Sequence, residues 1–357
     1  MTTNISGTSF QTSTESLFLM KPDNMTPTSC VDLGALQSPL AVLYTIIFIL
    51  GLVGNLVALW VFFCVQSKKN SVRVFLINVA FADLLLVVCL PFRILYHSGG
   101  NVWTLGPMLC KAVGNLFYMN MYISITLLGL ISVDRYLKIH RGTGGQHRLR
   151  STRWSWALCA GVWIIASTVT TVLLVSKNHS QEDRCFHYKL LLNAKWKAYL
   201  NICMLVLFWL VFVSLVVSYA KIALKLQRRS LEKPDLPNAS RYTRTARKSF
   251  FILFLFTVCF VPYHVVRVFY IKTQITETAC VWRGVADKAN EVALLFSALN
   301  SCLDPVMYFL LSSSVRKEVQ RLVSRVFCVQ DANAVSGSSS TAENWKAERG
   351  QATSSNL

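Results

Sequence analysis

The sequence predicts an all-α membrane protein: a seven-transmembrane helix bundle followed by a short amphipathic eighth helix. Composition is the first reason, because 53% of the 357 residues are apolar and only 15% are charged, whereas a soluble domain carries about 25% charged residues. The second reason is that seven stretches reach the roughly 20 apolar residues that a helix needs to cross a hydrocarbon core. Soluble folds and disulfide-built miniproteins are therefore disfavoured.

The seven expected spans hold nearly half of the chain. They are Leu40–Cys64, Val74–Tyr96, Leu109–Asp134, Trp154–Ser176, Ala198–Ala220, Ser249–Ile271 and Ala289–Ser312. Residues 1–39 precede this 40–312 bundle as an N-terminal tail. Apolar residues at helical spacing, with basic residues between them, predict that 313–328 form a helix on the membrane surface. Residues 329–357 are rich in Ser and Thr, which predicts a disordered cytoplasmic tail.

The placement of Lys and Arg predicts the orientation, since cytoplasmic loops carry an excess of both. With the N-terminus extracellular, the inner segments hold 24 Lys and Arg against 6 acids, and the outer segments hold 9 against 7. The net charge of +19 thus indicates a multi-pass plasma-membrane protein rather than a nucleic-acid partner. Sequons at Asn4, Asn24 and Asn178 fall outside. Cys328, after the amphipathic stretch, is a candidate palmitoylation site or a free thiol.

Polar side chains inside the spans are candidates for function, because an ionisable group in a bilayer is costly. Asp83, Ser124, Asn300 and Asp304 come from three different spans. Packed together, they could surround a small cation or share a proton, since two neighbouring carboxylates cannot both ionise cheaply. A purely structural hydrogen-bond cluster is the alternative.

Cationic and aromatic residues gather at the expected outer mouth of the bundle. Arg267 shares a helix face with His264, and Arg93 ends the second span. Each arginine predicts contact with an anionic ligand, with snorkelling to water as the alternative. Glu291 and Asn290 could receive an ammonium group. The expected ligand site comprises Arg93, Phe117, Tyr118, Met121, Tyr122, Phe186, Lys189, His264, Arg267, Tyr270, Asn290 and Glu291.

Other classes of protein find little support. Four cysteines, Cys30, Cys110, Cys185 and Cys280, fall in the oxidising outer segments, where three pairings are open. No zinc spacing, nucleophile elbow or phosphate loop is present, so the sequence predicts neither an enzyme nor a cofactor. A channel or transporter would need polar residues through the whole depth of the bundle, whereas here they cluster at the mouth, the middle and the inner end.

An ordered set of motifs from about Leu40 to Phe327 resembles the rhodopsin-like family of G-protein-coupled receptors. The motifs are Gly54-Asn55, Phe81-Ala82-Asp83, Trp103 with Cys110, Asp134-Arg135-Tyr136, Trp163, Tyr219, Cys259-Phe260-Val261-Pro262 and Asp304-Pro305-Val306-Met307-Tyr308. The resemblance implies a Cys110–Cys185 disulfide and a sodium pocket at Asp83, Ser124, Asn300 and Asp304. It also implies a G-protein switch made of Asp134, Arg135, Tyr136, Tyr219 and Tyr308, with Tyr219 facing Tyr308 across the bundle.

Within this family the chain is similar to the purinergic-receptor-like branch. Phe260 replaces the usual Trp, Asp304 replaces the usual Asn, and the branch implies an extra Cys30–Cys280 pair. The segments 117–124 and 185–188 are most similar to receptors of lysophosphatidylserine. The relatives that receive ADP have a Lys where this chain has Asn290, which weakens a nucleotide interpretation.

These observations predict a receptor for an anionic lysophospholipid, with lysophosphatidylserine favoured. The apolar residues of the third to fifth spans would take the acyl chain, and Glu291 with Asn290 would take the amine of a serine head group. A nucleotide receptor for ADP or a UDP-sugar is the alternative, and a channel or transporter is a remote one. The resemblance implies the inhibitory class of G protein as partner, and arrestin after phosphorylation of the tail.

Overall fold

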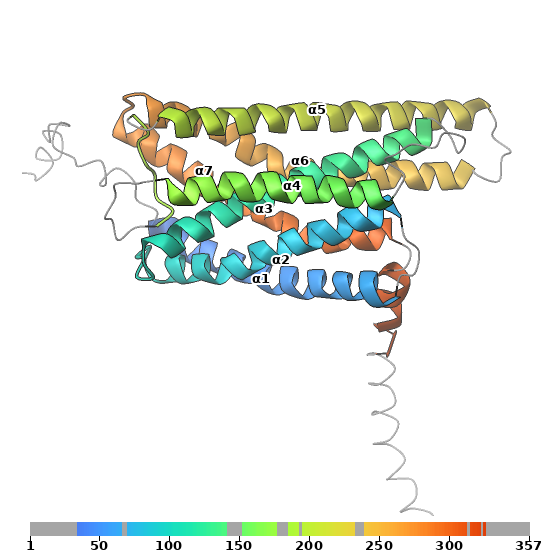
Figure 1. Cartoon of the computed structure of the whole chain (residues 1–357), viewed down its shortest axis with the longest axis horizontal. Coiled ribbons are helices and arrows are strands. Elements are labelled where there is room, and N and C mark those ends of the chain that lie inside the picture. The colour runs from blue at the N-terminus through green and yellow to red at the C-terminus, as the bar shows by residue number, and fades with distance from the viewer. Residues whose placement is uncertain are drawn as a thin grey trace, which may run out of the picture.

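A computed structural model describes residues 34–65, 70–140, 152–176, 185–192, 195–232, 239–312, 315–322 and 324–325. In these ranges seven helices are long and apolar enough to cross a membrane. Figure 1 shows them running side by side along the long axis of the molecule. They are α1 (Gln37–Trp60), α2 (Ser71–Ser98), α3 (Pro107–His140), α4 (Thr152–Val175), α5 (Lys195–Glu232), α6 (Ala239–Ile275) and α7 (Cys280–Leu311).

The predicted fold class is confirmed, and the main differences lie at helix ends. α7 begins at Cys280 rather than Ala289, and α5 begins at Lys195 and continues to Glu232. These extra turns carry charged residues, so hydropathy alone could not assign them to a helix. Residues 315–322 form a further short helix within the stretch predicted for the membrane surface, at the end of the bundle where α1 ends (Figure 1).

Buried polar contacts fix how the helices pack. The Asn55 amide on α1 donates to the Ser301 carbonyl on α7 over 2.8 Å, and the Trp163 indole on α4 donates to Asn78 on α2 over 3.0 Å. Gly54 is needed for the close approach of α1 to α7, because a Cβ there would lie 2.5 Å from Cγ of Pro305. Such bonds hold helices at fixed depths in a solvent that offers no competing partners.

α4 and α5 are the outermost helices of the bundle. Only 11% of the residues in their most apolar windows are buried, compared with 72% for α2. α4 packs on α2 and α3, and α5 packs on α3 and α6. Exposed side chains such as Ile165, Val175 and Leu210 therefore face lipid, and the space between α4 and α5 borders the bilayer.

A strapped loop covers one end of the bundle. The Cys110–Cys185 disulfide is confirmed, with 5.7 Å between the two Cα atoms, and ties residues 185–192 to α3. At its other end the loop is tied to α6, since the Leu191 amide donates to the Gln274 carbonyl over 3.0 Å and the Gln274 side chain donates to the Lys189 carbonyl over 2.8 Å. The loop is therefore held in register above the helices.

Several predictions concern residues outside the described ranges. These are the tail up to residue 33, the residues from 326 onward, the sequons at Asn4, Asn24 and Asn178, and Cys328. Cys280 is disulfide-bonded. Cys30, its expected partner, lies outside the described residues.

Candidate functional site

A cavity of about 1870 Å³ lies beneath the strapped loop, at the end of the bundle where α2 ends and α7 begins. Among the described residues, its wall carries a single carboxylate, Glu291, and six cationic side chains. The cationic side chains are Arg93, Lys111, Lys189, Lys197, Arg267 and Arg283. Like charges facing one space in a low-dielectric surrounding create a strongly positive potential, which favours an anionic ligand.

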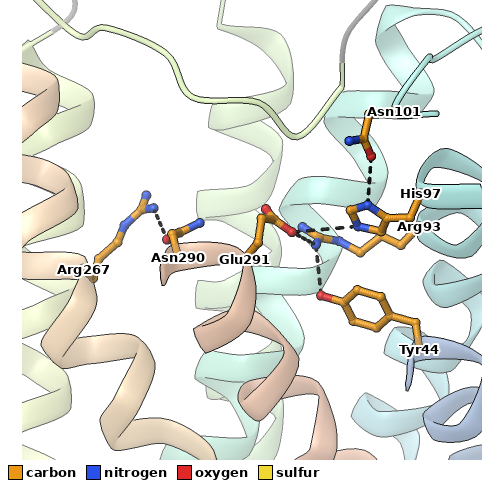
Figure 2. A network of polar contacts seen from close by, with 7 residues as sticks. All are labelled: Tyr44, Arg93, His97, Asn101, Arg267, Asn290 and Glu291. Carbon is orange, nitrogen blue, oxygen red and sulfur yellow. Dashed lines mark hydrogen bonds and ion pairs between the residues drawn. The ribbon is translucent and has the colours of Figure 1, made fainter. Parts of the chain in front are cut away.

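Arg93 on α2 is locked in place by a carboxylate. Its Nη1 lies 3.1 Å from Oε2 of Glu291 and donates to the Tyr44 hydroxyl over 3.2 Å, as Figure 2 shows. The rings of Phe117 and Phe186 each lie 4.5 Å from its Cζ atom. Arg93 is only 1% exposed, so this is a buried, charge-compensated pair. Such a pair is costly to break from either side.

His97 extends the same cluster by one helical turn. Its Nδ1 lies 3.0 Å from Oδ1 of Asn101, and its Nε2 lies 3.9 Å from Oε2 of Glu291 (Figure 2). Its ring stacks on Tyr44 at 5.8 Å between centroids. The α1–α2–α7 side of the cavity is thus a connected network whose charges are already matched.

Arg267 on α6 is held differently. Its Nη1 donates to Oδ1 of Asn290 over 3.2 Å, and its Nη2 donates to Oδ1 of Asn201 on α5 over 2.9 Å. The Tyr270 ring lies 4.7 Å from its Cζ atom. Both hydrogen-bond acceptors are neutral amides, so the guanidinium keeps its full charge in a site where it is 9% exposed. Figure 2 shows Asn290 and Glu291 between the two arginines.

The rest of the cavity wall is apolar. It is formed by residues of α3, α4 and α5, including Ile123, Ala166, Val169, Leu173, Met204 and Leu207. On α5 the chemistry changes down one helix face, from Lys197 through Asn201 to Met204 and Leu207. The cavity therefore has a cationic end and an apolar end, and the apolar end lies between the two helices that border lipid.

Nine of the twelve predicted ligand residues line this cavity. They are Arg93, Tyr118, Tyr122, Phe186, Lys189, Arg267, Tyr270, Asn290 and Glu291. Phe117, Met121 and His264 are not in its wall, and each is buried. His264 stacks on Phe208 at 3.5 Å between centroids and bonds the Phe260 carbonyl over 2.7 Å, so packing accounts for it. Helix spacing alone could not separate the wall from the layer behind it.

The sequence did not single out four polar residues of the wall: Lys111, Lys197, Asn201 and Arg283. Lys197 and Arg283 lie in helical turns beyond the predicted spans, and Lys111 and Asn201 lie near the ends of theirs. The available signals were the position of Lys111 beside Cys110 and the spacing of four between Lys197 and Asn201, which places both on one helix face.

Asp287, one turn before Glu291 on α7, is a buried carboxylate of another kind. It is fully buried, and neither of its oxygens has a hydrogen-bond partner among the described residues. Glu291 has Arg93, whereas no cation in the described part of the chain is bonded to Asp287. An uncompensated buried charge is costly, so this position lowers the stability of α7 near the site.

The predicted polar centre is assembled, deeper in the bundle. The Asn300 amide donates to Asp304 over 2.8 Å, and the Tyr308 hydroxyl donates to Asp83 over 3.3 Å. Asp83 and Asp304 lie within hydrogen-bonding reach of each other. Oδ1 of Asp83 and the hydroxyl of Ser124 are buried without a partner among the described residues. These oxygens fit a small cation, and the neighbouring carboxyls fit a shared proton equally well.

At the far end of the bundle the structure corrects one expectation. Tyr219 does not bond Tyr308: its hydroxyl lies 2.6 Å from that of Ser132, while Tyr308 bonds Asp83. Arg135 lies within electrostatic range of Asp134 and Tyr219. The two tyrosines are therefore each held by a local partner in this conformation, because the polar centre captures Tyr308 before it can reach across.

Comparison with known proteins defines the family. The family model described as "7 transmembrane receptor (rhodopsin family)" matches residues 54–308. "Probable G-protein coupled receptor 34" of Mus musculus is 48% identical over 304 residues, which cover 84% of this chain and 81% of that protein. A purinoceptor of Bos taurus, number 14 of its series, is 34% identical, covering 77% and 82% respectively. "Uracil nucleotide/cysteinyl leukotriene receptor" of Homo sapiens is also 34% identical, covering 78% and 75%.

The chain belongs to the rhodopsin family of seven-transmembrane receptors. It falls in the purinergic-like branch, near Probable G-protein coupled receptor 34. It is thus a multi-pass plasma-membrane receptor that signals through a G protein and is not an enzyme.

Proposed function

We propose that this receptor binds an anionic lysophospholipid, with lysophosphatidylserine favoured, and activates the inhibitory class of G protein. One observation carries the proposal: a single cavity is cationic at one end and apolar at the other, in line along α5. A lysophospholipid has the same order of chemistry, a charged head group joined to one acyl chain.

The head group is matched by the cationic end. Arg267 is buried and positively charged, and its hydrogen bonds within the described ranges go to the neutral amides of Asn290 and Asn201. An incoming anion therefore gains charge-assisted hydrogen bonds without displacing a carboxylate. A serine head group also brings an ammonium. Glu291 lines the cavity and bonds Arg93 through Oε2, so that Oε1 could accept from that ammonium.

The acyl chain is matched by the apolar end. Side chains of α3, α4 and α5 line it, and the space between α4 and α5 borders the bilayer. A chain placed there exchanges a lipid environment for a protein one, and each methylene removed from water contributes about 0.8 kcal/mol relative to an aqueous ligand. A nucleotide has no part that would use this surface.

Signalling would follow by population shift. The ligand binds one arrangement of α5, α6 and α7 better and so favours it. Arg267 is suited to this role because it joins α6 to Asn201 on α5 and to Asn290 on α7. We place the N-terminus outside, from the excess of Lys and Arg in the opposite segments, so that the Asp134-Arg135-Tyr136 end meets the G protein. Arrestin would bind the phosphorylated tail.

A ligand panel tests the proposal. Cells expressing the chain would be exposed to lysophosphatidylserine, lysophosphatidic acid, lysophosphatidylinositol, ADP and UDP-sugars, with G-protein activation as the readout and mock cells as control. We expect a response to lysophosphatidylserine that pertussis toxin abolishes, because the toxin blocks the inhibitory class. Responses to ADP or a UDP-sugar alone would overturn the lipid assignment.

A nucleotide receptor is the second candidate. The six cationic side chains of the cavity wall would suit a polyphosphate. The names of two relatives, the bovine purinoceptor and the human "Uracil nucleotide/cysteinyl leukotriene receptor", point in the same direction. The apolar wall and Asn290 in place of a cation favour the lipid.

The polar centre adds a dependence on sodium or on a proton. Asp83 and Ser124 would hold a sodium ion, with Asp304 nearby, or Asp83 and Asp304 would share a proton instead. Agonist affinity measured in sodium and in choline buffer separates the two: lower affinity in sodium supports the ion, and equal affinity supports the proton.

A further inference from the structure

Three lysines form a second cationic cluster in the cavity, apart from the two arginines. Lys111 lies near the start of α3, Lys189 lies in the strapped loop, and Lys197 lies in the first turn of α5. All three line the cavity and are half-buried. Lys197 lies within electrostatic range of both others.

The fold holds each lysine in place. Lys111 follows Cys110 of the disulfide, and its Nζ donates to the Ser176 carbonyl at the end of α4 over 3.4 Å. The backbone of Lys189 is bonded by the Gln274 side chain. The carbonyl of Lys197 accepts from the Asn201 side chain over 2.7 Å, and Asn201 in turn accepts from Arg267. Three cations converging from three elements repel one another, and a bound anion relieves that repulsion.

We infer that Lys111, Lys189 and Lys197 form a second anion-binding subsite, which holds the phosphate of the lysophospholipid. The inference rests on the proposed function. Lys197 lies above Asn201, Met204 and Leu207 on one face of α5, so this subsite adjoins the apolar end. In a lysophospholipid the phosphate is the anionic group nearest to the acyl chain. The second anionic group, the serine carboxylate, is farther away and is left for Arg267.

The chain supplies a matched control two residues away. Lys195 lies in the same first turn of α5, is exposed and is not part of the cavity wall. Lys195→Gln therefore removes the same charge from the same end of the same helix without touching the subsite. Lys197→Arg keeps the charge and serves as the rescue variant.

The test measures lysophosphatidylserine potency in a G-protein activation assay, at equal surface expression. We expect Lys111→Gln and Lys197→Gln each to lower potency about tenfold or more, the scale of one charge-assisted hydrogen bond, and to make potency less sensitive to salt. Lys195→Gln and Lys197→Arg should respond like the wild type.

Equal potency of Lys197→Gln and Lys195→Gln would overturn the subsite and leave the proposed function standing. A wild-type receptor silent to lysophosphatidylserine would overturn both. Loss of potency in Lys197→Arg as large as in Lys197→Gln would also count against the subsite, because it would show that packing matters there rather than charge.

Discussion

Arg93 and Arg267 are both buried arginines at the same end of the bundle, each close to aromatic rings, yet their partners differ. Arg93 lies 3.1 Å from a carboxylate, whereas Arg267 donates to two neutral amides. A buried cation with a matched anion is part of the structure, and a buried cation without one is available to a ligand. The difference separates a structural side of the cavity (α1, α2, α7) from a ligand-binding side (α3, α5, α6).

Replacing Arg93 should have the largest effect and tests the structural side. Arg93→Ala leaves Glu291 buried and unpaired, which costs about 3–5 kcal/mol of folding free energy. We expect a large fall in thermal stability in detergent and in surface expression. Arg93→Met combined with Glu291→Gln, which removes both charges, should recover most of the loss. Normal stability of Arg93→Ala would show that Glu291 is not held by this pair.

Replacing Arg267 tests the ligand-binding side. Arg267→Ala should weaken an anionic agonist by about 1.5–3 kcal/mol, the scale of a charged hydrogen bond. Its amide partners stay polar but uncharged, so the thermal stability should change far less than in Arg93→Ala. The measurement is a dose–response curve beside a melting curve. An unchanged dose–response would remove Arg267 from the ligand site.

Asp287 sharpens the comparison from the acidic side. Unlike Glu291, it has no hydrogen-bond partner among the described residues. Asp287→Asn keeps the shape and removes the charge, so we expect the receptor to be more stable by about 1 kcal/mol. Glu277→Gln, at an exposed acid of the same end, is the control. A drop in the melting temperature of Asp287→Asn would mean that the carboxylate has a partner after all.

His264 should show the smallest effect on the ligand. Because it lies behind the cavity wall and stacks on Phe208, His264→Phe should change agonist potency by less than about 0.5 kcal/mol, roughly twofold. Tyr122→Phe, at a residue that does line the cavity, is the matched variant. A tenfold loss in His264→Phe would place the imidazole in the ligand site.

Much of this arrangement could be predicted from the sequence, and the parts that could not have physical causes. Each predicted span overlaps one helix, because apolar length is written directly in the composition. The turns of α5 and α7 beyond the spans carry charges, so hydropathy missed Lys197 and Arg283. The site residues were chosen by type and helix face, which recovered Arg93 and Arg267 but not their difference.

That difference depends on contacts between distant segments. Glu291 lies 198 residues from Arg93, and Asn201 lies 66 residues from Arg267. Spacing along the chain shows which residues share a helix face. It cannot show which acid a given arginine meets. The pairing of Tyr308 with Asp83 rather than with Tyr219 was missed for the same reason.

The most direct test of the lysophospholipid assignment compares lysophosphatidylserine with glycerophosphoserine, the same head group without its acyl chain, on the wild-type receptor. The measurement is the potency ratio in G-protein activation. Because the apolar wall between α4 and α5 is expected to bind the chain, we predict a loss of more than about 100-fold on deacylation, which the burial of only a few methylenes would supply. Equal potency of the two compounds would contradict the account, since it would show that the cationic end alone defines the ligand.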